Sequence, residues 1–262
     1  SLRLLYVSPE RLPRLAGMLA ERRVSVGRLA VYEAHCIAEW GHDFRPSYRA
    51  ILDARRVMGY PPVIALTGSA TVAVREQIRR SLGLGRDAAV VVGSFDRANL
   101  RFEVRNVMSR EDRLAKMVVL VRTTSGSAVV YAPTRGTVEG LCRVLIDAGV
   151  AAAPYHAGMA ADDRSAVLSG FLGDQYSVVV ATCAFGMGID KPGVRLVAHW
   201  TMPSTPESYY QEAGRAGRDG NQARCVLYYH PSDHRLPLQQ VAATFPDEKL
   251  IEMLWGDPSL RR

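Results

Sequence analysis

Two arginines, Arg215 and Arg218, lie three residues apart in the run "YYQEAGRAGRDG". At this spacing, one face or one end of a helix aims both guanidinium groups at the same phosphate group. Phosphoryl transfer needs such positive charge, because the γ-phosphate oxygens accumulate negative charge during the reaction. A solvated arginine pair is the simpler alternative, but Gly214, Gly217 and Gly220 favour a backbone that approaches a ligand.

A second candidate site follows the apolar run Leu29-Ala30-Val31. Such a buried strand commonly delivers a pair of carboxylates to the edge of a sheet, where a metal-bound nucleotide could sit. Here the pair is Tyr32 and Glu33. A phenol is neutral at pH 7 with a pKa near about 10, so it is a poor substitute for a carboxylate around a hard cation.

Aromatic and charged side chains alternate a few residues later, at Trp40, His42, Asp43, Phe44 and Arg45. Bases of a single-stranded nucleic acid stack on such aromatic rings, while an arginine meets a phosphate or stacks in turn. Trp40 and Phe44 alone would more often be core residues. The charged residues beside them favour an exposed loop.

The elements that must position these residues follow an α/β pattern. Short β-branched runs such as "AVVYA" and "SVVVA" alternate with helical patterns such as "GTVEGLCRVLIDAG", which predicts parallel sheets flanked by helices. Further strands are predicted at "LLYV" and "AVVVG". A helix capped by Ser204 or Thr205 is expected to carry Gln211, Arg215 and Arg218.

Two sets of these units are expected, one over residues 1–105 and a second over residues 106–230, followed by a helical appendage over residues 231–262. The chain has 262 residues, of which 48% are hydrophobic and 23% charged, and this composition is ordinary for a globular protein. Its formal charge of +7 is compatible with a polyanionic partner but also with a solvated basic surface.

Membrane insertion and metal binding by cysteine are not indicated. No apolar run reaches the roughly 18 residues of a membrane span, and the N-terminus lacks the pattern of a signal peptide, so a cytoplasmic location is expected. The four cysteines are far apart with no CxxC pair, so we expect neither a zinc site nor a disulfide framework. The sequence gives no prediction of the oligomeric state.

Eight motifs together resemble the RecQ family of DNA helicases: "YVSPERL", "EAHCIAEWGHDFRPSY", "ALTGSAT", "SFDRANLRF", "VVYAPTR", "YHAGM", "ATCAFGMGIDKP" and "YYQEAGRAGRDG", in that family's order, from residue 6 to about residue 230. The resemblance implies two RecA-like domains and ATP-dependent 3′-to-5′ unwinding of DNA in repair and recombination. It also implies ATP and Mg²⁺ as ligands and single-stranded and forked DNA as partners.

The resemblance also assigns roles at the nucleotide. Glu33 matches the glutamate that activates the attacking water, and His35 matches the residue that links it to Thr67-Gly68-Ser69. The remaining matches lie in the second half of the chain: Gly188 and Asp190 in a nucleotide-contacting loop, Gln211 as a polar coupling residue, and Arg215 and Arg218 as the arginines that meet the phosphates.

Nucleic-acid contacts are implied in both halves of the chain. Trp40, His42, Phe44 and Arg45 match the aromatic-rich loop that couples single-stranded DNA to ATP hydrolysis. In the second domain, Tyr131, Arg135 and His156 match segments that contact the nucleic-acid backbone.

Two departures from the family bear on activity. The 262 residues contain no GxxxxGK[ST] pattern, and Tyr32 stands where family members generally have the Asp that holds magnesium. We therefore expect an N-terminally truncated chain whose first domain is incomplete and less stable, with weakened magnesium binding and impaired catalysis. A fragment, a decayed gene, a reading error and an adaptation all remain open, and so do a DNA-binding module without turnover and an RNA helicase.

Overall fold

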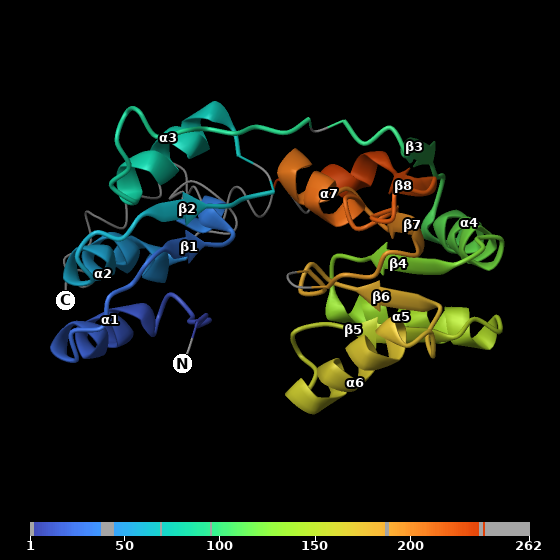
Figure 1. The fold of residues 1–262 in the computed structure, drawn as a ribbon. Helices are drawn as coiled ribbons and strands as arrows, with labels where there is room; N and C mark the ends of the chain where they lie inside the picture. Colours follow the sequence, from blue (N-terminus) through green and yellow to red (C-terminus); the bar gives the residue numbers. More distant parts are fainter. Residues whose placement is uncertain are drawn as a thin grey trace, which may run out of the picture. The chain divides into compact units, whose positions relative to one another are not determined.

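The computed structural model describes residues 3–37, 45–68, 70–94, 96–186, 189–235 and 238. The chain divides into two compact units, Ser1–Gly93 and Ser94–Arg262. Each unit has a parallel sheet with helices packed on it, so the predicted α/β class with parallel sheets is confirmed (Figure 1). No helix among the described residues is long and apolar enough to cross a membrane.

The first unit has a short sheet in which β1 (Leu29–Val31) pairs in parallel with β2 (Val63–Ala65). Its helical elements are α1 (Leu12–Glu21), η1 (Ala34–Ile37), η2 (Pro46–Ala50), α2 (Ile51–Val57) and α3 (Val72–Ser81). Helix α3 begins where the Thr71 side chain accepts a hydrogen bond from the Val74 amide, which satisfies one of the free N–H groups of its first turn.

One face of the β1–β2 sheet is covered and the other is exposed. Val31 is buried among α1, α2 and α3 side chains, whereas Ile64 is 47% exposed. Tyr32 and Leu66, at the ends of the two strands, are 66% and 49% exposed. Residues 4–7 and 89–93, which the sequence predicts as strands, form none, and that prediction was wrong. Apolar runs of this kind favour a strand only where a pairing partner is present.

The second unit contains a parallel six-stranded sheet in the order β3-β8-β7-β4-β6-β5. The strands are β3 (Leu100–Asn106), β4 (Ser127–Tyr131), β5 (Ala152–Tyr155), β6 (Val178–Ala181), β7 (Val194–His199) and β8 (Ala223–Tyr229). The helical elements are α4 (Arg110–Arg122), α5 (Arg135–Asp147), α6 (Ala161–Leu172), α7 (Pro206–Ala213) and η3 (Pro231–His234).

This unit has three layers (Figure 1). On one face of the sheet, Met117 of α4 and Leu145 of α5 are fully buried. On the other face, Phe171 of α6 and Ala213 of α7 are fully buried. All five residues of β4 are buried, because this central strand is covered on both sides.

The boundary between the units lies between Gly93 and Ser94 rather than near residue 105. Strand β3 pairs along its whole length with β8, so the residues that the sequence suggested as the end of the first domain belong to the second sheet. Of the expected appendage over residues 231–262, the structure describes residues 231–235 and 238, and the remainder lies outside the described residues.

Candidate nucleotide and nucleic-acid site

The predicted arginine pair lies on a turn after α7 and not on the helix itself. Thr205 caps α7 by accepting a hydrogen bond from the Ser208 amide at 3.1 Å, and the helix ends at Ala213. Gln211 is on α7, whereas Arg215 and Arg218 follow its last residue. Gly217 has φ +55°, a left-handed conformation that suits glycine and turns the chain away from the helix axis.

Arg218 is tied to the loop that precedes β7. Its Nη1 donates to the Ile189 carbonyl at 2.8 Å and to Asp190 Oδ1 at 3.0 Å. The Asp190 side chain is 79% exposed, so water weakens this ion pair. Arg218 and Asp190, both predicted as nucleotide-contacting residues, are thus brought together by direct contact.

Arg215 is half-buried and lies beside Gly186 and Tyr131. A Cβ atom built on Gly186 would lie 3.4 Å from Arg215 Nη2, so the glycine permits this close approach. The buried Arg215 Nε has no hydrogen-bond partner among the described residues. A buried donor without a partner is costly, so the Arg215 side chain is held in an unfavourable setting.

Tyr131, in a segment that the family resemblance links to nucleic-acid contact, is buried at the end of β4. The residue is 4% exposed and its hydroxyl donates to the Phe185 carbonyl at 2.8 Å. Its ring stacks on His199, with the ring centroids 5.3 Å apart. Burial raises the pKa of Tyr131, so the phenol stays neutral. The last residue of β4 points into the core instead of out of the sheet.

In the first unit, Glu33, His35 and Thr67 come together after β1 and β2. His35 Nδ1 lies 3.0 Å from Thr67 Oγ1 and 3.3 Å from Glu33 Oε2. This is the contact between the acidic segment and residue 67 that the family resemblance implies. Glu33 has φ +51°, a left-handed backbone that is uncommon for a residue with a side chain and that directs its carboxylate.

The residues at this place do not fit a magnesium ion. Tyr32 contributes a phenol, and the carboxylate that follows it, Glu33, is paired with His35. Across the described part of the chain, no group of three or more His, Cys, Asp or Glu side chains could hold a metal. The Tyr32 backbone carbonyl is also engaged, because it accepts a hydrogen bond from the Tyr48 hydroxyl at 3.0 Å.

Arg135 and His156 follow the carboxyl ends of β4 and β5, which lie on either side of β6. Arg135 is exposed and packs on Gly158, where an added Cβ would lie 2.7 Å from its Nη1. His156 is 6% exposed, with Nε2 at 3.1 Å from Glu139 Oε1. Arg135 is therefore open to solvent, whereas His156 is buried and contacts Glu139 of α5.

The aromatic-rich loop falls largely outside the described residues. Trp40, His42 and Phe44 are not described, and the same is true of Gly188 and Ser69. Arg45 is described: its side chain is exposed, and its amide donates to the Cys36 carbonyl at 3.0 Å.

Three residues in the quoted motifs contribute contacts that the sequence did not assign. Lys191 Nζ donates to the Phe171 carbonyl and to Asp174 Oδ1, both at 2.7 Å, so it caps the end of α6. Arg97 and Asn99, in "SFDRANLRF", bind carbonyls of the turn after α7. Because these three residues lie in the quoted motifs, the sequence could have singled them out. Their spacing does not reveal which carbonyls they bind.

The chain is similar in sequence and in fold to known proteins. Residues 110–220 match the family described as "Helicase conserved C-terminal domain". A Pasteurella multocida protein named "ATP-dependent DNA helicase RecQ" is 42% identical over 234 residues, covering 89% of this chain and 37% of that protein. A Haemophilus influenzae protein of the same name is 41% identical over 246 residues, covering 94% and 39%.

A structural match has the same architecture at lower sequence identity. The Mycobacterium smegmatis helicase Lhr, solved with ssDNA and AMP-PNP, matches with a TM-score of 0.67 and 22% identity, covering 90% of this chain and 33% of that one. Fold and motifs together define the class of architecture, RecA-like units like those of helicases. Within that class, the chain is similar over most of its length to these two proteins named RecQ, at identities of 42% and 41%. It spans 37% and 39% of the length of these two relatives.

Proposed function

We propose that this chain is a segment of an ATP-dependent RecQ-type DNA helicase that moves 3′-to-5′ along single-stranded DNA and unwinds forks during repair and recombination. The observation that supports it most is the turn after α7, which presents Arg215 and Arg218 together. Arg215 has a buried, unpartnered Nε among the described residues, and Arg218 has a water-exposed carboxylate as its partner. Both guanidinium groups can therefore exchange their present surroundings for phosphate oxygens.

Each of the proposed site residues has a separate role in ATP hydrolysis that follows from its chemistry. Arg215 and Arg218 place positive charge at the γ-phosphate, where negative charge develops. Glu33 is the base that orients and deprotonates the attacking water. His35 holds Glu33 and Thr67 in one network, so a change at the water reaches the segment after β2. Gln211, on the helix before the arginine turn, couples this site to the nucleic acid.

The binding of magnesium is the step for which the residues of this chain are least suited. The ion neutralises phosphate charge in this class of reaction, and its protein ligands are carboxylates. Tyr32 provides none, so we propose that catalysis by this chain is impaired while nucleic-acid binding is retained. In the second unit Arg135 is proposed to contact single-stranded DNA. In the first unit the same role is proposed, from the family resemblance, for Arg45, Trp40 and Phe44, with His42 between those two aromatic residues in the sequence.

Steady-state ATP hydrolysis tests this proposal. The chain and its Tyr32→Asp variant are compared in the presence of magnesium, with and without single-stranded DNA. Tyr32 is 66% exposed, so the substitution is expected to leave the fold intact. We expect the variant to hydrolyse ATP at least about tenfold faster than the unmodified chain, because the carboxylate supplies a magnesium ligand.

The outcomes separate the alternatives. DNA-stimulated turnover by the unmodified chain equal to that of the variant would contradict the proposed role of Tyr32. If neither hydrolyses ATP but both bind DNA with a steep salt dependence, the chain is a DNA-binding module without turnover. Equal stimulation by RNA and DNA would favour an RNA helicase instead.

A further inference from the structure

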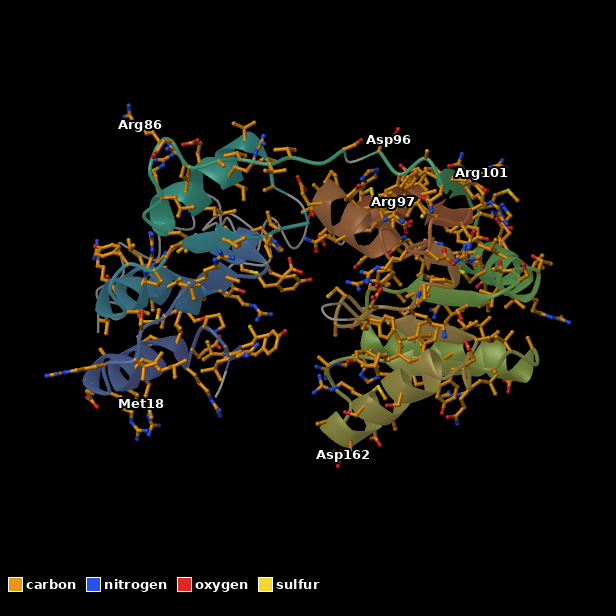
Figure 2. All side chains as sticks on the ribbon, in the orientation of Figure 1. Met18, Arg86, Asp96, Arg97, Arg101 and Asp162 are labelled. Carbon is orange, nitrogen blue, oxygen red and sulfur yellow. The ribbon has the colours of Figure 1, made fainter. Side chains whose placement is uncertain are left out.

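The segment that enters the second unit makes a dense set of contacts with the arginine turn. Arg97, labelled in Figure 2, donates from Nη2 to the Ala216 carbonyl at 3.1 Å and to the Gly217 carbonyl at 2.9 Å, and from Nη1 to the Gly214 carbonyl at 3.5 Å. One guanidinium group thus contacts three carbonyls of the turn that carries Arg215 and Arg218.

Asn99 adds a second set of bonds from the same segment. Its Nδ2 donates to the Gly217 and Asn221 carbonyls, both at 2.8 Å. The Asn99 carbonyl accepts from the Ala223 amide at 2.9 Å, and the Asn99 side-chain oxygen accepts from Arg97 Nε at 3.4 Å. The side chains of Arg97 and Asn99 and the Asn99 backbone therefore bind the turn at both its beginning and its end.

These bonds meet a specific need of the turn. The Gly214, Ala216 and Gly217 carbonyls follow the last residue of α7, so no bond within the helix satisfies them, and a cation is favourable at that end of a helix. A planar guanidinium fixes several acceptors at once, which an ammonium group on a flexible stem does not. Gly217 allows the close fit, because a Cβ there would lie 2.5 Å from Asn99 Nδ2.

We propose that Arg97 and Asn99 are positioning residues for phosphate recognition, which hold the turn so that Arg215 and Arg218 address one phosphate group. The role rests on the proposed function, in which those two arginines meet the nucleotide. Arg97 and Asn99 touch only the turn and its neighbours among the described residues, so they act through Arg215 and Arg218 and not on the nucleotide.

The test uses two substitutions in the full chain, each with a matched control. Asn99→Asp replaces a donor with a carboxylate that faces the Gly217 and Asn221 carbonyls and repels them. Asn106→Asp is the matched control, because it makes the same change on β3 at an exposed side chain. Arg97→Lys keeps the charge but removes the fork, and Arg101→Lys is its control, since the Arg101 side chain is 77% exposed.

Two readouts need no nucleotide. Amide hydrogen exchange over residues 214–221 is expected to rise at least about tenfold in Asn99→Asp and Arg97→Lys, with the controls unchanged. Phenylglyoxal modification of Arg218 is expected to accelerate by a factor of about three or more, because its bonds to Ile189 and Asp190 depend on the turn. Unchanged exchange, or unchanged Arg218 reactivity, would overturn the positioning role.

ATP hydrolysis by the same variants distinguishes positioning from general stabilisation. We expect kcat to fall at least about tenfold with KM within about twofold of the unmodified chain. A higher KM at constant kcat would overturn the proposal. Absence of turnover in the unmodified chain contradicts only the proposed function of this chain, and exchange and modification rates then decide the role of Arg97 and Asn99.

Discussion

Glu103 shows how one residue can make stability depend on pH. On β3, its carboxylate accepts a hydrogen bond from Arg224 Nε at 3.0 Å and from Arg105 Nη2 at 2.8 Å. These bonds, that of Arg224 first, lower the pKa of Glu103 from 4.5 to about 2. A carboxyl group with a lowered pKa in the folded state stabilises the fold above its unfolded pKa, and this contribution disappears as the pH falls through the folded value.

We therefore predict that Glu103→Gln lowers the melting temperature at pH 7 and that its difference from the unmodified chain shrinks as the pH falls from 4.5 toward about 2. Thermal unfolding followed by circular dichroism across this range measures the difference. Asp147→Asn, at an exposed position in the last turn of α5, serves as a control of small effect. A difference that stays constant down to pH 2 would rule out Glu103 as the titrating group.

The sequence motifs predict which side chains come into contact better than they predict which side chains are buried. The link from His35 to Thr67 follows from the motifs, because both segments come directly after neighbouring parallel strands. The burial of Tyr131 and His156 does not follow, because a residue at a strand end points to either side depending on the helices that pack there. The Phe185 carbonyl that binds the Tyr131 hydroxyl is 54 residues away in the sequence.

Among the elements, α4 and η3 are joined by a buried ion pair. Arg113 Nη2 donates to both oxygens of Asp233, at 2.9 and 2.8 Å, and the side chains are 8% and 6% exposed. The guanidinium also lies over the Trp200 ring, 5.5 Å from its centroid. Removing one partner of a buried pair leaves the other charge without compensation.

Arg113→Ala is accordingly predicted to lower the free energy of unfolding by about 3–5 kcal/mol. Urea unfolding monitored by circular dichroism measures it. Lys116→Ala is the matched control on the same helix, because its pair with Asp112 is more exposed and should contribute less than about 1 kcal/mol. Equal losses for the two variants would show that burial of the Arg113–Asp233 pair has no special effect.

From the difference between the two sheets we predict that the second unit resists local unfolding more strongly than the first. Among the described residues, the first unit has a two-stranded sheet with one exposed face, whereas the second has a six-stranded sheet in which β4, β6 and β7 are buried almost throughout. We expect the slowest-exchanging amides of β4, β6 and β7 to be protected at least about tenfold more than those of β1 and β2. Hydrogen exchange with mass spectrometry tests this, and equal protection in both units would contradict it.

Element prediction succeeded where patterning and capping agree. The runs "AVVYA" and "SVVVA" became β4 and β6, and the Thr205 cap set the start of α7. Strand β5, "AAPY", has no β-branched residue, so its composition does not predict it, and it forms because β6 offers a parallel partner. The end of α7 was set too late, because the glycine turn is stabilised by Arg97 and Asn99, more than 100 residues earlier.

For the whole molecule, charge is the property that favours a nucleic-acid partner. The formal charge of +7 does not by itself identify a binding surface; the positions of the basic side chains decide which surface attracts a polyanion. Arg135 is exposed at the start of α5, directly after the carboxyl end of β4, where parallel α/β sheets commonly bind ligands. Arg122, in the last turn of α4, is also exposed but follows no strand end.

This difference leads to a prediction about DNA binding by the full chain. If Arg135 contacts a phosphate of single-stranded DNA, Arg135→Ala removes one released counterion and reduces the slope of log K against log salt by about 0.7. Arg122→Ala leaves the slope unchanged and lowers affinity only slightly at low salt. Fluorescence anisotropy with a labelled oligonucleotide at several salt concentrations measures both slopes. Equal slopes for the two variants would mean that the positive charge attracts DNA diffusely, and that the edge of the sheet beyond β4 is not the surface that binds the strand.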